Sequence, residues 1–141
     1  MNTSHRFAVA VHIMALLRMS EQALSSSYIA GSVNTNASMI RRILAMLGKA
    51  GLTSSSMGST GGTVLARPAS KVSLLEIYRA VDEPGILALH SSAPNPACEV
   101  GRGITAVLEA IVGRAEQAME SEIAAVTVQD VVQALRRTKR K

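Results

Sequence analysis

The chain of 141 residues is 48% apolar and 18% charged, which is enough apolar sequence for one folded domain and too much for a disordered chain. Its longest apolar run, residues 7–17, is shorter than the roughly 20 residues of a membrane span, so we expect a cytoplasmic protein without a membrane partner. Three aromatic residues are few for a protein that stacks single-stranded bases, and one cysteine excludes a multi-cysteine metal site within one chain.

The net charge of +5 is unevenly distributed along the chain. Residues 1–72 hold seven basic residues and one acidic residue, a net charge of +6. Residues 73–135 hold three basic and nine acidic residues, a net charge of −6, and residues 136–141 add five bases. A basic N-terminal half is typical of a protein that binds a polyanion.

Two helices are predicted at the start of the chain. Thr3 or Ser4 is expected to cap a helix that ends near residue 19, because a hydroxyl accepts the unpaired N–H groups of a first helical turn. One of the serines at 25–27 caps a shorter helix that ends near residue 33. Residues 34–36 then form a tight turn, since asparagine tolerates left-handed backbone angles.

The third predicted helix, residues 36–50, has two contrasting faces. Its apolar residues fall at helical spacing and predict a core stripe. They are Ile40, Ile43, Leu44 and Leu47. The opposite face is small, polar and cationic, and it comprises Ser38, Arg41, Arg42, Ala45 and Lys49.

A β-hairpin and a fourth helix follow. Two β-capable segments, residues 52–56 and 63–65, flank a glycine-rich loop, and this pattern predicts a hairpin. Ser73 is expected to cap a helix that contains Val81 and ends before Pro84.

The C-terminal part is predicted to be a dimerisation region. Residues 84–97 form a linker, and a helix of more than twenty residues begins near Cys98 and ends near Val126. Its apolar stripe, which includes Ile104, Val107 and Ile111, needs a partner surface, and the same helix of a second subunit supplies one economically. Thr127 caps a last helix that holds Val131, Val132 and Leu135. The expected domains are therefore residues 1–83, the linker 84–97, the dimerisation helices 98–135 and a basic tail 136–141.

Short helices joined by a tight turn and followed by a hairpin constitute a winged helix-turn-helix. The expected fold is thus mainly α with a small β-hairpin wing and a long C-terminal dimerisation helix. The second helix of this motif enters the major groove of duplex DNA. We expect Ser38, Arg41, Arg42, Ala45 and Lys49 to face the DNA, and the hairpin tip with Gly61 to approach the backbone or the minor groove.

Several short motifs stand in the order found in one family of bacterial regulators. They are FAVAV (7–11), IRRIL (40–44), KAGL (49–52), GG (61–62), LARP (65–68) and SLLEIYRAV (73–81). Over nearly its whole length the chain resembles the Rrf2 family, and within it the YwnA-like branch. The resemblance implies a homodimer whose long helices cross between subunits, and repressor activity.

Two positions depart from the family pattern. Family members with an iron–sulfur cluster hold it on three cysteines before the long helix, where this chain has Cys98 alone, so no cofactor is expected. Many members carry an arginine at the wing tip, where this chain has Met57. Contacts from Ser55, Ser59 or Thr60 to phosphate are the expected substitute.

The signal and the alternatives stay open. Cys98 at a helix N-terminus is a candidate redox sensor for oxidants or electrophiles, and the alternative is an inert thiol. His5 and His12 lack a third ligand, so no metal is expected. A regulator controlled by an unidentified small molecule and a winged-helix module that binds protein are the competing functions. No nucleophile–base pair indicates an enzyme. A symmetric dimer predicts a pseudo-palindromic operator with half-sites about 10 base pairs apart, or a multiple of that.

Overall fold

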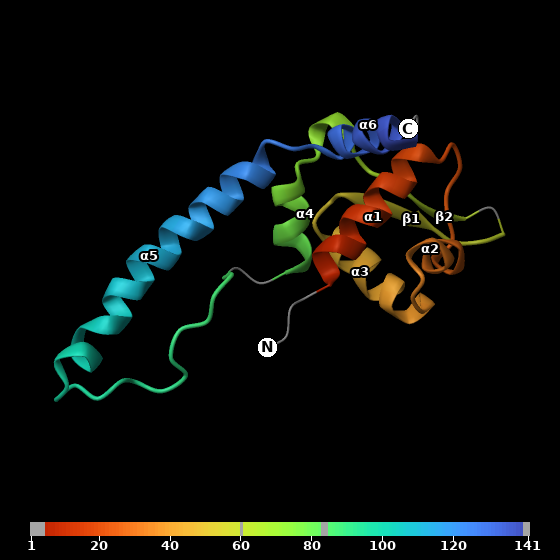
Figure 1. Cartoon of the computed structure of the whole chain (residues 1–141). Coiled ribbons are helices and arrows are strands. Elements are labelled where there is room, and N and C mark those ends of the chain that lie inside the picture. The colour runs from red at the N-terminus through yellow and green to blue at the C-terminus, as the bar shows by residue number, and fades with distance from the viewer. Residues whose placement is uncertain (1–4, 60, 83–84, 140–141) are drawn as a thin grey trace.

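The computed structural model describes residues 5–59, 61–82 and 85–139. Three helices come first: α1 (Arg6–Met19), α2 (Ser26–Val33) and α3 (Ala37–Lys49). An antiparallel hairpin of β1 (Thr53–Ser56) and β2 (Gly62–Leu65) and the 3₁₀ turn η1 (Ala69–Lys71) follow. The chain then forms α4 (Leu74–Val81), the long α5 (Glu99–Ala124) and α6 (Val128–Lys139). Figure 1 shows α5 extending away from the other elements. The predicted fold, mainly helical with one hairpin and a long C-terminal helix, is confirmed.

The helices begin at side chains that satisfy unpaired backbone N–H groups. Ser25 Oγ accepts the N–H of Tyr28 at 3.1 Å and begins α2, and Asn36 Oδ1 accepts the N–H of Met39 at 2.8 Å and begins α3. Asn34, between these helices, has the left-handed φ of 66° that the sequence predicted for this turn. Helix α1 has His5 at its N-cap position without a side-chain cap. Thr3 and Ser4, the expected caps, lie outside the described residues.

The core is aliphatic and lies between α1, α3, α4 and α6. Ile13 and Met14 of α1 are fully buried, as are Ile40 of α3 and Val132 of α6. The predicted core stripe of α3 is confirmed, since its four apolar residues are all buried. The rings of Phe7 and Tyr78 meet edge to face at 5.9 Å, and this contact joins the start of α1 to α4.

The hairpin is held against the helices by a third extended segment. Leu24, in the link between α1 and α2, exchanges two backbone hydrogen bonds with Thr63 of β2, at 3.1 and 2.9 Å. Gly62 lies beside this link with a φ of +148°, and a Cβ there would meet the Leu24 backbone at 2.8 Å. The wing is therefore fixed at its base by a close approach that only glycine permits.

Helices α5 and α6 differ in how they are packed. Helix α5 has 26 residues and none is buried within one chain. Helix α6 packs against α1 and places Val128 and Val132 in the core of the winged domain. The sequence had predicted residues 98–135 as dimerisation helices, so this packing differs from the expectation for residues 128–135. Helix α6 also continues through Lys139, so most of the basic tail is helical. Within the described residues, no helix combines the length and apolar character needed to cross a bilayer.

Candidate DNA-binding surface

Helix α3 presents the predicted cationic face to solvent. The side chains of Arg41, Arg42 and Lys49 are exposed, and so are Ser38 and Ala45. Arg41 Nη2 donates a hydrogen bond to Ser38 Oγ at 3.4 Å, one turn earlier on the helix. Because the buried stripe occupies the opposite side of α3, the polar face does not contribute to the hydrophobic core. It is a continuous surface of small and positively charged residues.

The wing brings its serines close to this region, but in different settings. Ser55 is exposed, yet its Oγ lies 3.0 Å from Thr63 Oγ1 across the hairpin, so one of its hydrogen bonds is already made. Ser59 is exposed at the tip and Gly61 is half-buried. A Cβ on Gly61 would overlap the backbone of Ser56 and Met57. Thr60, another expected contact, lies outside the described residues.

Two exposed residues near this surface were not among the predicted contacts. Tyr28, in the first turn of α2, has 60% of its surface exposed, and Met57 at the wing tip has 98%. The spacing of α2 could have identified Tyr28, because the cap at Ser25 and the buried pair Ile29 and Ala30 fix its face. No sequence signal distinguishes Met57 from an apolar residue folded back onto the hairpin.

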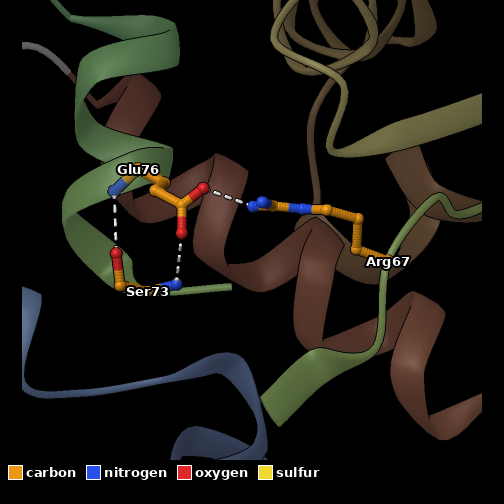
Figure 2. Close-up of polar contacts among 3 residues, drawn as sticks. All are labelled: Arg67, Ser73 and Glu76. Atoms are coloured by element: carbon orange, nitrogen blue, oxygen red, sulfur yellow. Dashed lines mark hydrogen bonds and ion pairs between the residues drawn. The ribbon is translucent and has the colours of Figure 1, made fainter. Parts of the chain in front are cut away.

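An ion pair connects the segment after the wing to α4. Figure 2 shows Glu76 of α4 receiving the Arg67 guanidinium and completing a capping box with Ser73. Partial burial alone would raise the pKa of Glu76, but hydrogen bonds from Arg67 and from the Ser73 backbone outweigh it, and the pKa is lowered. The carboxylate thus holds the chain after β2 to the first turn of α4.

Helix α4 is connected in turn to α5. Arg79 Nη2 lies 3.4 Å from Glu120 Oε2, and the backbone N–H of Ile86 donates to Glu116 Oε1 at 3.3 Å. Separate polar contacts therefore join the segment after the wing to α4, and α4 and the chain after it to α5.

Cys98 occupies the N-cap position of α5 and is exposed. The backbone N–H groups of Gly101 and Val100, in the first turn of α5, hold the pKa of the Cys98 thiol below its usual value. Asn95 accepts the Cys98 backbone N–H at 3.2 Å and fixes the turn before the helix. The thiol is thus accessible and more acidic than a free cysteine.

Two clefts flank α1 and could admit a small molecule. A cleft of about 460 Å³ lies between α1, α3 and α4, and it is lined by Arg6, Lys49, Arg79 and Asp82 among others. Arg6 and Asp82 form an ion pair across it at 3.5 Å. A second cleft of about 440 Å³ is mostly apolar and lies between α1 and α6.

The residues present do not fit an iron or iron–sulfur group. Among the described residues, no three His, Cys, Asp or Glu side chains gather as metal ligands, and the sequence has one cysteine. His12 Nε2 instead lies 2.9 Å from Ser32 Oγ of α2.

A helix-turn-helix with an exposed cationic second helix, flanked by a β-hairpin, defines the class of winged helix-turn-helix regulators. Residues 3–134 match the model of the Rrf2 family, which is described as an iron-dependent transcriptional regulator. The chain belongs to the Rrf2 family of transcriptional regulators. The predicted family is thereby confirmed, and its members are regulators and not enzymes.

A curated relative and two solved structures support this assignment. The chain is 41% identical to the HTH-type transcriptional regulator YwnA of Bacillus subtilis strain 168 over 128 residues, which cover 90% of this chain and 94% of YwnA. The crystal structure of a protein described as DNA-binding has a TM-score of 0.73 and 37% identity, and the match covers 89% of this chain and 97% of that one. A transcriptional regulator from Lactobacillus plantarum has a TM-score of 0.78 and 25% identity, with coverage of 94% and 90%.

Proposed function

We propose that this protein is a repressor that binds a pseudo-palindromic operator in duplex DNA as a homodimer. Helix α3 enters the major groove, Arg41 and Arg42 reach phosphates or guanine edges, and Ser38 and Ala45 allow close approach. Lys49 binds phosphate near the C-terminal end of α3. Ser55, Ser59, Thr60 and Gly61 of the wing approach the neighbouring backbone.

The observation that carries this proposal is the division of α3 into two faces. Three cations are exposed on one side of the helix, while the other side is buried in the core. A protein-binding module would expose apolar or acidic residues at this position. The exposed cations instead suit the phosphates that supply most of the affinity for DNA.

The test compares two variants that each remove one positive charge. Arg42→Ala removes it from the exposed face of α3, and Lys71→Ala removes it from η1, which packs beside α6. Binding is measured by fluorescence anisotropy at fixed salt, with the DNA upstream of the protein's own gene and a scrambled duplex. We expect Arg42→Ala to weaken specific binding by more than about 1 kcal/mol, and Lys71→Ala to leave it nearly unchanged. Equal losses in the two variants would contradict the assigned orientation of α3.

The homodimer is supported by the surface of α5. Val100, Val107 and Ile111 are 67%, 55% and 48% exposed, on a helix with no buried residue. An isolated chain would leave this apolar stripe in water, and pairing two such helices removes it from solvent.

A response to oxidants is a second candidate, supported by the setting of Cys98. Its exposed thiol is more acidic than usual, so its thiolate can attack hydrogen peroxide: the S–O bond of a sulfenic acid forms as the O–O bond breaks, and hydroxide leaves and takes a proton from solvent. We expect hydrogen peroxide to abolish operator binding by the wild-type protein and to leave Cys98→Ser unaffected, with dimedone labelling as the direct readout. Equal sensitivity of the two proteins would exclude this sensor while leaving DNA binding intact.

A further inference from the structure

The wing carries no charge at all. Residues 50–66 include no Lys, Arg, Asp or Glu, although the N-terminal half as a whole is strongly basic. The wing therefore contributes no charge–charge attraction to phosphates, and any contact it makes with DNA depends on hydroxyl groups and apolar surface.

The tip of this uncharged wing projects one large apolar side chain. Met57 is 98% exposed, and its neighbours Ser56, Gly58 and Ser59 are small. Gly58 has a φ of +106°, and the Gly61 N–H donates to the Gly58 carbonyl at 3.0 Å. Gly61 also lies close to the Met57 backbone, so Met57 is exposed beside two glycines that are hydrogen-bonded to each other.

The base of the wing is hydrogen-bonded to α3. The N–H of Leu52, which precedes β1, donates to Leu47 of α3 at 2.9 Å, and the N–H of Ala66 after β2 donates to Leu52 at 3.1 Å. With α3 in a major groove, the hairpin beside it reaches the adjacent minor groove. Apolar side chains such as methionine insert there between base steps, or lie along the groove, and favour sequences that deform easily.

We propose that Met57 is a specificity-determining residue that makes an uncharged contact in the minor groove. This inference rests on the proposed DNA-binding function and assigns to the wing a contribution that does not depend on salt. Selectivity at the flanks of the operator then follows from groove shape and step flexibility, because an apolar side chain forms no hydrogen bonds with base edges.

The experiment first uses the wild-type protein to select a duplex from a random library. Affinity for that duplex is then measured for Met57→Ala, Met57→Leu and Met57→Arg over a range of salt concentrations. Leu87→Ala, which removes a side chain that is 60% exposed outside the winged domain, is the matched control. In parallel, 2,6-diaminopurine replaces adenine in the base pairs protected by the wing, which adds an amino group to the minor groove and leaves the major-groove pattern intact.

We expect Met57→Ala to lower affinity at least about fivefold without changing the slope of log K against log salt. Met57→Leu and Leu87→Ala should bind like the wild type, and Met57→Arg should steepen the slope by about 1. Diaminopurine should weaken the wild type and have little further effect on Met57→Ala.

Two results would overturn the proposal: an affinity of Met57→Ala within twofold of the wild type, or an equal diaminopurine effect in both proteins. Failure of the wild type to select any duplex is a different outcome, because it overturns the proposed DNA-binding function itself. Thermal unfolding distinguishes both from misfolding, since a side chain this exposed contributes little to stability.

Discussion

At the scale of single residues, the wing and the start of α4 depend on positions that tolerate little change. Gly62 has a backbone angle that L side chains rarely adopt and lies against the Leu24 backbone. Glu76 joins Arg67 to Ser73 through three polar contacts. A substitution at either position is therefore expected to change the free energy of unfolding.

Gly62→Ala is expected to destabilise the fold by about 1–3 kcal/mol, because the added Cβ meets the Leu24 backbone at a strained φ. Gly31→Ala in α2 is the control, since its Cβ would meet nothing within 4 Å and alanine favours a helix. Urea unfolding measures both, and the control should gain about 0.5–1 kcal/mol. Similar effects in the two variants would contradict the close packing at Gly62.

Glu76 should make stability depend on pH in the acid range. Its pKa is lower in the folded protein than the ordinary value of an unfolded glutamate, so its stabilisation is present near neutral pH. It is lost as the pH falls through the folded pKa. The carboxylate is 43% exposed, so we expect only about 0.5 kcal/mol from it.

Urea midpoints at pH 7 and pH 3 test this expectation. Glu76→Gln should unfold at a lower urea concentration than the wild type at pH 7, and the difference should shrink at pH 3. Glu109→Gln, which changes an exposed carboxylate of α5, is the control. A difference for Glu76→Gln that persists at pH 3 would indicate a packing effect instead of a lost charge.

At the scale of elements, the helices could be predicted from the sequence wherever caps and apolar spacing agreed. Ser73 accepts a backbone N–H where the sequence predicted a cap, Ser25 does so as one of the three candidate serines, and Asn36 does so at the end of the predicted turn. The element against which α6 packs could not be predicted in this way. Val131, Val132 and Leu135 show that the helix has an apolar face, but its partner is set by where the chain returns after α5.

The candidate DNA-binding surface could be predicted from the sequence on α3 but not at the wing tip. The periodicity of α3 identifies the side that carries Arg41 and Arg42, because burial of Ile40 and Ile43 leaves them outside. The exposure of Met57 depends on the conformation of the hairpin tip, and no periodic pattern extends over so short a segment.

The exposed apolar stripe of α5 leads to a prediction about dimerisation. Its 26 residues span about 39 Å with an apolar stripe that one chain leaves uncovered. Val107→Asp places a carboxylate in that stripe and should weaken dimerisation at least about 100-fold, because an unpaired charge is costly to bury. Sedimentation equilibrium measures the change. Ala106→Asp, which adds the same charge on the opposite side of the helix, should remain dimeric, and a monomeric control variant would contradict the assigned interface.

At the scale of the whole molecule, the distribution of charge predicts how salt affects binding. Helix α6 packs against α1 and η1, and Figure 1 shows it above α1, whereas α3 lies below α1. We therefore expect the exposed Arg136 and Arg137 of α6 to lie away from DNA held by α3. Attraction over such a distance is screened at physiological salt, where the Debye length is about 8 Å, and extends farther at 0.01 M, where it is about 30 Å.

Replacing Arg136 and Arg137 with glutamine should accordingly change operator affinity less than about twofold at 0.15 M salt. A larger loss is expected at 0.01 M. Anisotropy titrations at the two concentrations give both values. Arg42→Ala serves as the comparison, because a direct contact should be lost at either concentration. A large loss at 0.15 M would place the C-terminal cations against the DNA.

The path of the chain through α5 determines which fragments of the molecule keep an intact core. The winged domain is discontinuous in sequence: the chain leaves it after α4 and returns as α6, whose Val128 N–H donates to the Val72 carbonyl at 3.0 Å. The Leu74 N–H likewise donates to the Val126 carbonyl at 2.8 Å. A fragment that ends at residue 82 would lose α6 and uncover part of its own core. The long helix is therefore an insertion between α4 and α6, and a fragment that folds like the winged domain must retain α6.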